Sequence, residues 1–149
     1  MLDGERVYRL VLKSLHNYIL TRKTRTVFIK TRVLWNHVVS LYGVGLPYQR
    51  IARALDRLSN VKMMIVYPDD HIKTANAYLE VFSRSKHEKS ILYIATQELI
   101  DLARKYDPDT FTELLLPFLL PTQTKGPIVR IMSIETKTKI AELTEAPAI

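Results

Sequence analysis

Three stretches near the start of the chain place apolar side chains at the spacing of a helix with one buried face. They run from Glu5 to about Leu20, from Thr31 to Gly43 and from Leu46 to Asn60. Steps of three and four residues put such positions on one side of a helix, which can then pack against a core. Thr31 is a residue type that caps helices, and Gly43 is a typical helix end. The pattern predicts three helices.

The third stretch also has a basic side. Its apolar positions are Tyr48, Ile51, Ala52, Leu55 and Leu58, and its basic positions are Arg50, Arg53 and Arg57. Pro47 suits a first helical turn, because the N–H that it lacks would have no partner there. Ser59 and Asn60 form a plausible stop. We therefore predict a short amphipathic helix whose cationic side faces outward.

Alternating and β-branched residues predict strands elsewhere in this half of the chain. Val27 to Lys30 predicts a brief strand. Lys62 to Tyr67 and Ala77 to Phe82 predict the two strands of a hairpin, with a long tip from about Pro68 to Asn76. Two acids lie in that tip, Asp69 and Asp70.

The second half of the chain predicts further helices. Ser85 and Glu88 have the spacing of a capping box ahead of a helix from Ile91 to Tyr106. Asp107 and Pro108 end that helix and cap another, which Pro117 breaks. Beyond Pro121, the residues from Ile128 to Ile134 could pair as a strand, and the residues from Thr144 to Ile149 are expected to be a frayed end.

The order helix, strand, helix, tight turn, helix, strand, loop, strand resembles the winged helix-turn-helix superfamily. In this resemblance Thr31 to Gly43 is the support helix, Leu46 to Ser59 the recognition helix and Lys62 to Phe82 the wing. It implies an α+β, mainly α fold with additional C-terminal helices at about 86–120 around a core motif at about 6–82. We expect one domain over residues 1–121 and an extended or partly ordered tail over 122–149. The acidic tip departs from the pattern, because Asp69 and Asp70 oppose contact with phosphates.

The distribution of charge supports a polyanionic partner independently of that resemblance. The net charge is +7, but residues 1–90 hold sixteen basic and seven acidic residues, whereas residues 91–149 hold six and eight. From Thr21 to Lys62 there are nine basic residues and one acid, Asp56. A basic excess of this kind is typical of proteins that bind nucleic acid.

A helix fits the major groove of B-DNA, and arginine suits both guanine edges and phosphates. We expect Gln49, Arg50 and Arg53 to face bases or phosphates, and Arg57 with the basic connector to hold the DNA backbone. The predicted DNA-binding residues are Arg22, Lys23, Arg25, Arg32, Tyr48, Gln49, Arg50, Arg53 and Arg57.

The sequence gives little reason to expect catalysis. It has no cysteine, its four histidines are scattered, and Gly43 and Gly45 lack the Lys-Ser/Thr ending of a phosphate-binding loop. Glu80 is not followed by the lysine of a nuclease motif. We expect no enzyme activity, no metal and no cofactor. Trp35, Tyr8, Tyr18 and Tyr42 are expected to pack in the core.

The start of the chain lacks the plan of a signal peptide, and its longest strongly apolar run, Leu114 to Leu120, is too short to span a membrane. We therefore expect a cytoplasmic protein with no membrane partner. The favoured function is double-stranded DNA binding, sequence-selective or general, by a small transcription regulator that forms a homodimer through its first and C-terminal helices. The alternative is a winged-helix interaction subunit of a replication, transcription or membrane-remodelling assembly, and recognition of structured RNA stays open.

Overall fold

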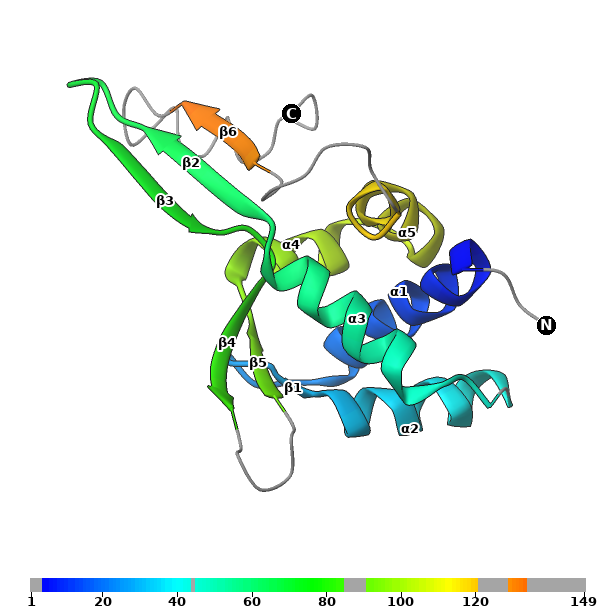
Figure 1. The fold of residues 1–149 in the computed structure, drawn as a ribbon. Coiled ribbons are helices and arrows are strands. Elements are labelled where there is room, and N and C mark those ends of the chain that lie inside the picture. Colours follow the sequence, from blue (N-terminus) through cyan, green and yellow to red (C-terminus); the bar gives the residue numbers. More distant parts are fainter. Residues whose placement is uncertain (1–3, 44, 85–90, 121–128, 134–149) are drawn as a thin grey trace.

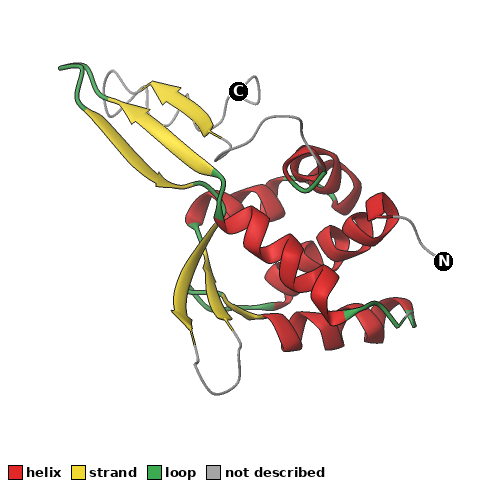
Figure 2. Ribbon diagram, viewed as in Figure 1, coloured by secondary structure: helices red, strands yellow, loops and turns green. Residues whose placement is uncertain are grey.

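The structure, a computed structural model, describes residues 4–43, 45–84 and 91–120, and the backbone of residues 129–133. It contains helices and two separate small sheets, so the fold is α+β (Figures 1 and 2). In chain order the elements are α1 (Gly4–Thr21), β1 (Phe28–Lys30), α2 (Thr31–Tyr42), α3 (Tyr48–Ser59), β2 (Lys62–Val66), β3 (Ile72–Asn76), β4 (Leu79–Arg84), β5 (Ile91–Ala95), α4 (Gln97–Lys105), α5 (Pro108–Leu115), the 3-10 helix η1 (Leu116–Phe118) and β6 (Val129–Ser133).

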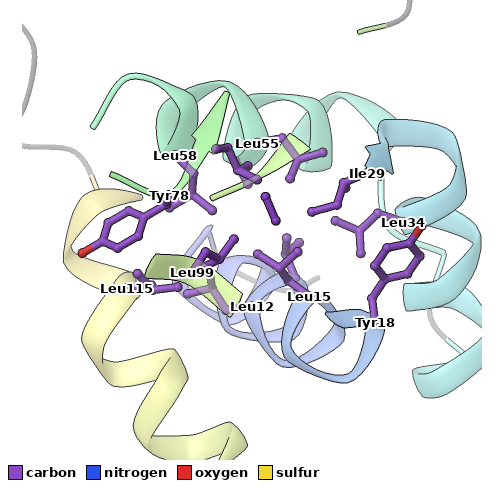
Figure 3. Packing of buried hydrophobic residues seen from close by; sticks show 14 of the residues in the cluster. Leu12, Leu15, Tyr18, Ile29, Leu34, Leu55, Leu58, Tyr78, Leu99 and Leu115 are labelled. Atoms are coloured by element: carbon purple, nitrogen blue, oxygen red, sulfur yellow. The ribbon is translucent and has the colours of Figure 1, made fainter. Parts of the chain in front are cut away.

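Helix α1 is the centre of the core. Its side chains are buried on several sides, because α2, α3, α4 and α5 all pack against it. Leu12 and Leu15 are fully buried, and Figure 3 shows them among residues from α3, β1 and α5. Two surface ion pairs also join α1 to α5: Arg9 with Glu113, and Lys13 with Asp109 at 3.3 Å. Exposed pairs of this kind add little stability, so the packing holds these helices together.

The first sheet has the antiparallel strand order β1-β5-β4. Ile29 pairs with Tyr93, and Tyr93 pairs with Val81, which places the three on one face. Ile29 and Tyr93 are buried there, so this inner face closes the core beside the helices. The opposite face carries Phe28 and is exposed.

The second sheet has the order β3-β2-β6 and projects from the helices as an arm (Figure 1). Strand β2 pairs antiparallel with β3 and parallel with β6. The strand predicted near residues 128–134 is therefore confirmed at 129–133, whereas the expected frayed end at 144–149 lies outside the described residues.

The hairpin predicted from Lys62 to Phe82 is wrong in its pairing. β2 pairs with Ile72–Asn76, which was assigned to the tip, and the true turn spans Tyr67 to His71. Asp70 adopts a left-handed φ of 64°, a conformation that aspartate tolerates, and this tightens the turn. β4 instead pairs with β5, in the other sheet.

The helix predicted from Ile91 to Tyr106 is also wrong in its first part. Ile91–Ala95 is the central strand β5, and the helix begins only at Gln97. Thr96 caps it, since its hydroxyl oxygen accepts a hydrogen bond from the Leu99 N–H at 3.2 Å. An unbroken short apolar run suits a strand as well as a helix, which explains the error. The proposed capping box at Ser85 and Glu88 lies outside the described residues.

The other helix ends follow the sequence closely, with two exceptions. Gly43 ends α2 in a left-handed conformation, with φ of 63°, and its N–H donates to the Val39 carbonyl at 2.8 Å. Asp107 caps α5, and its hydrogen bonds to Thr110 hold the pKa of this carboxyl below its usual value. Thr31 is buried as the first residue of α2, while the cap residue is Lys30. Pro47 is the cap residue of α3 and does not belong to its first turn.

The end of the helical region agrees with the sequence. α5 stops at Leu115, and the break expected at Pro117 is the 3-10 turn η1. Among the described helices, none combines the length and the apolar character needed to cross a membrane.

Candidate nucleic-acid interface

Helix α3 has one face built into the core and one in solvent. Ile51, Leu55 and Leu58 are fully buried. Figure 3 shows Leu55 and Leu58 pointing from α3 into the core. On the opposite side, steps of four and three residues align four exposed polar side chains. This α3 ridge consists of Gln49, Arg53, Asp56 and Asn60.

The three arginines of α3 do not share one outward face. Arg53 is exposed on the α3 ridge, whereas Arg50 and Arg57 are half-buried on the flank that faces α1. A Cβ added to Gly4 would lie 3.4 Å from Arg50 Nη1, so the Arg50 guanidinium reaches the first residue of α1. The expectation of one cationic side made of all three residues is therefore corrected.

Arg57 is tied to the scaffold. Its Nη1 donates a hydrogen bond to the Leu119 carbonyl, and its guanidinium carbon lies 6.0 Å from the Tyr8 ring centroid. Leu119 follows η1 and is itself buried. Arg57 thus links the end of the helical region to α3.

The turn between α2 and α3 is held by an aromatic cluster. Trp35 Nε1 donates to the Leu46 carbonyl at 2.6 Å, and the Trp35 and Tyr48 ring centroids are 6.3 Å apart. The Arg32 guanidinium carbon lies 6.0 Å from the Tyr48 ring centroid. The structure therefore brings Arg32 and Tyr48 together at the start of α3. The core role predicted for Trp35 is confirmed in part, since it is half-buried and packs on the core.

The basic connector between α1 and β1 lies beside a different part of the protein. Arg22, Lys23 and Arg25 are all exposed. The Arg22 guanidinium carbon is 4.3 Å from the Tyr18 ring centroid, and Tyr18 donates its hydroxyl to the Phe28 carbonyl at 2.9 Å. The connector is thus adjacent to β1.

Helix α2 separates that connector from the start of α3. His37 turns toward α1, where its Nε2 lies 3.0 Å from Asn17 Oδ1 and its ring packs edge-to-face on Tyr18. Burial, and then the charge of Arg22, lower the pKa of His37. Trp35 turns the other way, toward Tyr48. The predicted contact residues therefore form two groups on two sides of α2, and not one continuous surface.

The core positions predicted for three other tyrosines are confirmed for two of them. Tyr8 and Tyr18 are buried in the core, as expected, whereas Tyr42 is exposed at the end of α2. Burial raises the pKa of Tyr93 to about 12, and the charge of Asp56 adds to this effect. Tyr93 accordingly keeps its proton at neutral pH.

No group of three or more metal-binding side chains forms among the residues that the structure describes. His16 is a buried residue satisfied within the core, because its Nε2 lies 2.7 Å from the Tyr106 carbonyl oxygen and must donate to it. Its ring packs edge-to-face on Phe111.

Two exposed aromatic residues, Phe28 and Phe82, were not among the residues predicted from the sequence. Their exposed fractions are 42% and 59%, and both lie on the first sheet. The sequence could have predicted the exposure of Phe28. Side chains alternate between the two faces of a strand, so with the apolar neighbours Val27 and Ile29 in the core, Phe28 points outward. No comparable signal exists for Phe82, whose direction depends on an irregularity in the pairing of β4 with β5.

Comparisons of this chain with models of protein families, with curated proteins and with solved structures found no match.

Proposed function

We propose that this chain is a winged helix-turn-helix protein that binds double-stranded DNA with the α3 ridge in the major groove. The observation that carries the proposal is the α3 ridge itself. It is a row of polar side chains that stands in solvent on a helix whose opposite face is fixed in the core. A helix presented in this way has the diameter and the donor groups to enter the groove.

The arrangement of the elements supports the winged-helix part of the proposal. Helices α1, α2 and α3 pack together, β1 lies between the first two, and a hairpin of β4 and β5 pairs with β1. We assign the wing to this β4-β5 hairpin instead of Lys62 to Phe82. The β2-β3 arm is then an insertion between the recognition helix and the wing. Asp69 and Asp70 belong to the arm, so the wing in this assignment does not carry these two acids.

The chemistry of the α3 ridge supports reading of base edges. Arginine can bind guanine through two hydrogen bonds, and glutamine can do the same with adenine. Asp56, a turn further on, can accept from the amino group of cytosine. Both donors and acceptors are offered, which favours sequence-selective binding over a purely electrostatic contact. We assign Arg32, next to Tyr48, to a flanking phosphate.

In this proposal Arg57 has a structural role. The role as a transcription regulator and the homodimer stay predictions. The apolar faces of α1, α4 and α5, which were expected to form a dimer, pack into the core of the chain itself. Of the large apolar side chains on α4 and α5, only Leu114 is exposed among the described residues.

A binding measurement with a matched control tests the proposal. The anisotropy of a labelled duplex of mixed sequence is followed at two salt concentrations for the wild type, for Gln49→Ala with Arg53→Ala, and for Arg104→Ala. Arg104 is exposed on α4, and its loss removes the same single charge. We expect the double variant to bind at least about tenfold more weakly, and Arg104→Ala to bind like the wild type. Unchanged binding by a double variant with a wild-type circular dichroism spectrum would overturn the proposal.

A further inference from the structure

The outer face of the first sheet is exposed and aromatic. The pairing places Phe28, Ile94 and Glu80 in one row across the three strands, and Lys30, Leu92 and Ser83 in the next. Ile94 and Leu92 are half-buried, and they form an apolar floor between the two edge strands. None of the described helices covers this side of the sheet, since they pack on the face that holds Ile29 and Tyr93 (Figure 1).

Two phenylalanine rings stand on this floor. The pairing of β4 with β5 shifts between Val81 and Ser83, and the residue within the shift, Phe82, turns onto the outer face. Its ring meets Phe28 edge-to-face, with centroids 5.2 Å apart and an angle of 75°. Phenylalanine is normally among the most buried residues. A contacting pair with exposed fractions of 42% and 59% is therefore a candidate binding site.

The segment of chain that leads into Phe28 is basic. The connector that leads into Phe28 contributes three exposed cations, Arg22, Lys23 and Arg25, and no acid. Arg22 stacks on the Tyr18 ring, and the Tyr18 hydroxyl donates to the backbone carbonyl of Phe28. Lys30 lies in the next row of the sheet, and Glu80 is the one acid of the two rows.

We propose that Phe28 and Phe82 form a stacking platform for unpaired nucleobases of single-stranded DNA or RNA, whose phosphates meet the connector cations. Aromatic rings beside cations are the combination that binds single strands, because every base has a face to stack and every linkage a negative charge. The cations favour a polyanion over an apolar protein surface. This platform is a second site, on the other side of α2 from the start of α3.

The test uses labelled oligothymidylate and oligouridylate, which have no pairing partner, with a duplex measured in parallel. Phe82→Ala is expected to lower affinity for the single strands about 5- to 150-fold, the loss of one stacked base. Phe82→Trp keeps a ring and should restore binding, whereas Phe82→Leu keeps only apolar volume and should not. Leu114→Ala, which removes an exposed apolar side chain from α5, serves as the control and should bind like the wild type.

Each outcome decides the matter. Loss with alanine and leucine, and recovery with tryptophan, support the platform, and the two oligonucleotides show whether the sugar matters. Equal single-strand affinity for Phe82→Ala and the wild type would overturn it. So would a Phe82→Ala variant that loses concentration-dependent self-association in sedimentation but keeps its affinity for the oligonucleotides, since the face would then bind another protein. Duplex binding by the Gln49 and Arg53 variant is measured separately, so this proposal can fail while the proposed function stands.

Discussion

The α3 ridge and the outer face of the first sheet rest on the same core but offer different chemistry. The α3 ridge carries two amides, a guanidinium and a carboxylate, whereas the sheet face carries two phenylalanine rings. Amide and guanidinium groups suit the edges of paired bases, and rings suit the faces of unpaired ones. The basic residues from Thr21 to Lys62 therefore lie on two surfaces, because α2 separates them in space.

We expect the largest effect from a substitution in the core that supports both surfaces. Leu55 is fully buried beneath the α3 ridge, so Leu55→Ala leaves a cavity and should lower the free energy of unfolding by about 2–5 kcal/mol. Urea unfolding followed by circular dichroism measures this. Binding to duplex and to single strands should then fall together, in proportion to the folded fraction. A variant that lost only one of the two activities would contradict a shared scaffold.

The next effect separates two arginines one turn apart on the same helix. Arg57→Ala removes the donor to the Leu119 carbonyl and should destabilise the protein by about 1–3 kcal/mol. Arg53→Ala, on the exposed α3 ridge, should change stability by no more than about 0.5 kcal/mol. The same urea experiment compares them.

For duplex binding we expect the opposite ranking, with the larger loss of affinity in Arg53→Ala. Measured at a temperature where both are folded, Arg53→Ala should weaken binding and Arg57→Ala should not. Equal stability of the two variants, or weaker duplex binding by Arg57→Ala than by Arg53→Ala, would remove the distinction that we draw between them.

We expect low pH to reduce the stability of the protein, because Asp107, the cap residue of α5, becomes protonated. The pKa of Asp107 is lowered in the folded state, mainly by hydrogen bonds to Thr110, so the unfolded chain binds the proton more readily. This contribution to stability is present above the ordinary aspartate pKa and is lost as the pH falls through the lower folded value. The Tm difference between the wild type and Asp107→Ala should therefore shrink from pH 7 toward pH 2. A difference that stayed constant would argue against the cap.

The smallest expected effect lies inside α1. Within the described part of the chain, the Ser14 hydroxyl is buried without a hydrogen-bond partner. Ser14→Ala removes an unsatisfied group and improves helix propensity, so we expect stability to be unchanged or higher by up to about 1 kcal/mol. Both binding activities should stay as in the wild type. A loss of stability in urea unfolding would mean that the hydroxyl has a partner after all.

The sequence predicted the helices of the first half well, because their apolar residues follow helical spacing over many positions. Strand partners were harder. β4 pairs with β5 instead of β2, and nothing in the pattern of Ala77 to Phe82 names its partner. The run from Ile91 to Ile94 is too short for periodicity to separate a strand from a helix.

The candidate site was predicted only in outline. Spacing correctly placed Arg53 and Gln49 away from the core, but it could not show that Arg50 and Arg57 lean toward α1. The orientation of Arg57 depends on Leu119, which lies far along the chain. The platform of Phe28 and Phe82 depends on a local shift in strand pairing, which side-chain types alone do not reveal.

The most direct test of the central claim uses the absence of cysteine from the chain. Single variants Gln49→Cys and Arg104→Cys are each labelled with a photoactivatable benzophenone and illuminated with a labelled duplex. The account predicts strong cross-linking from position 49 on the α3 ridge and little from position 104 on α4. Equal yields at the two positions, or a higher yield from position 104, would contradict the claim that the α3 ridge enters DNA.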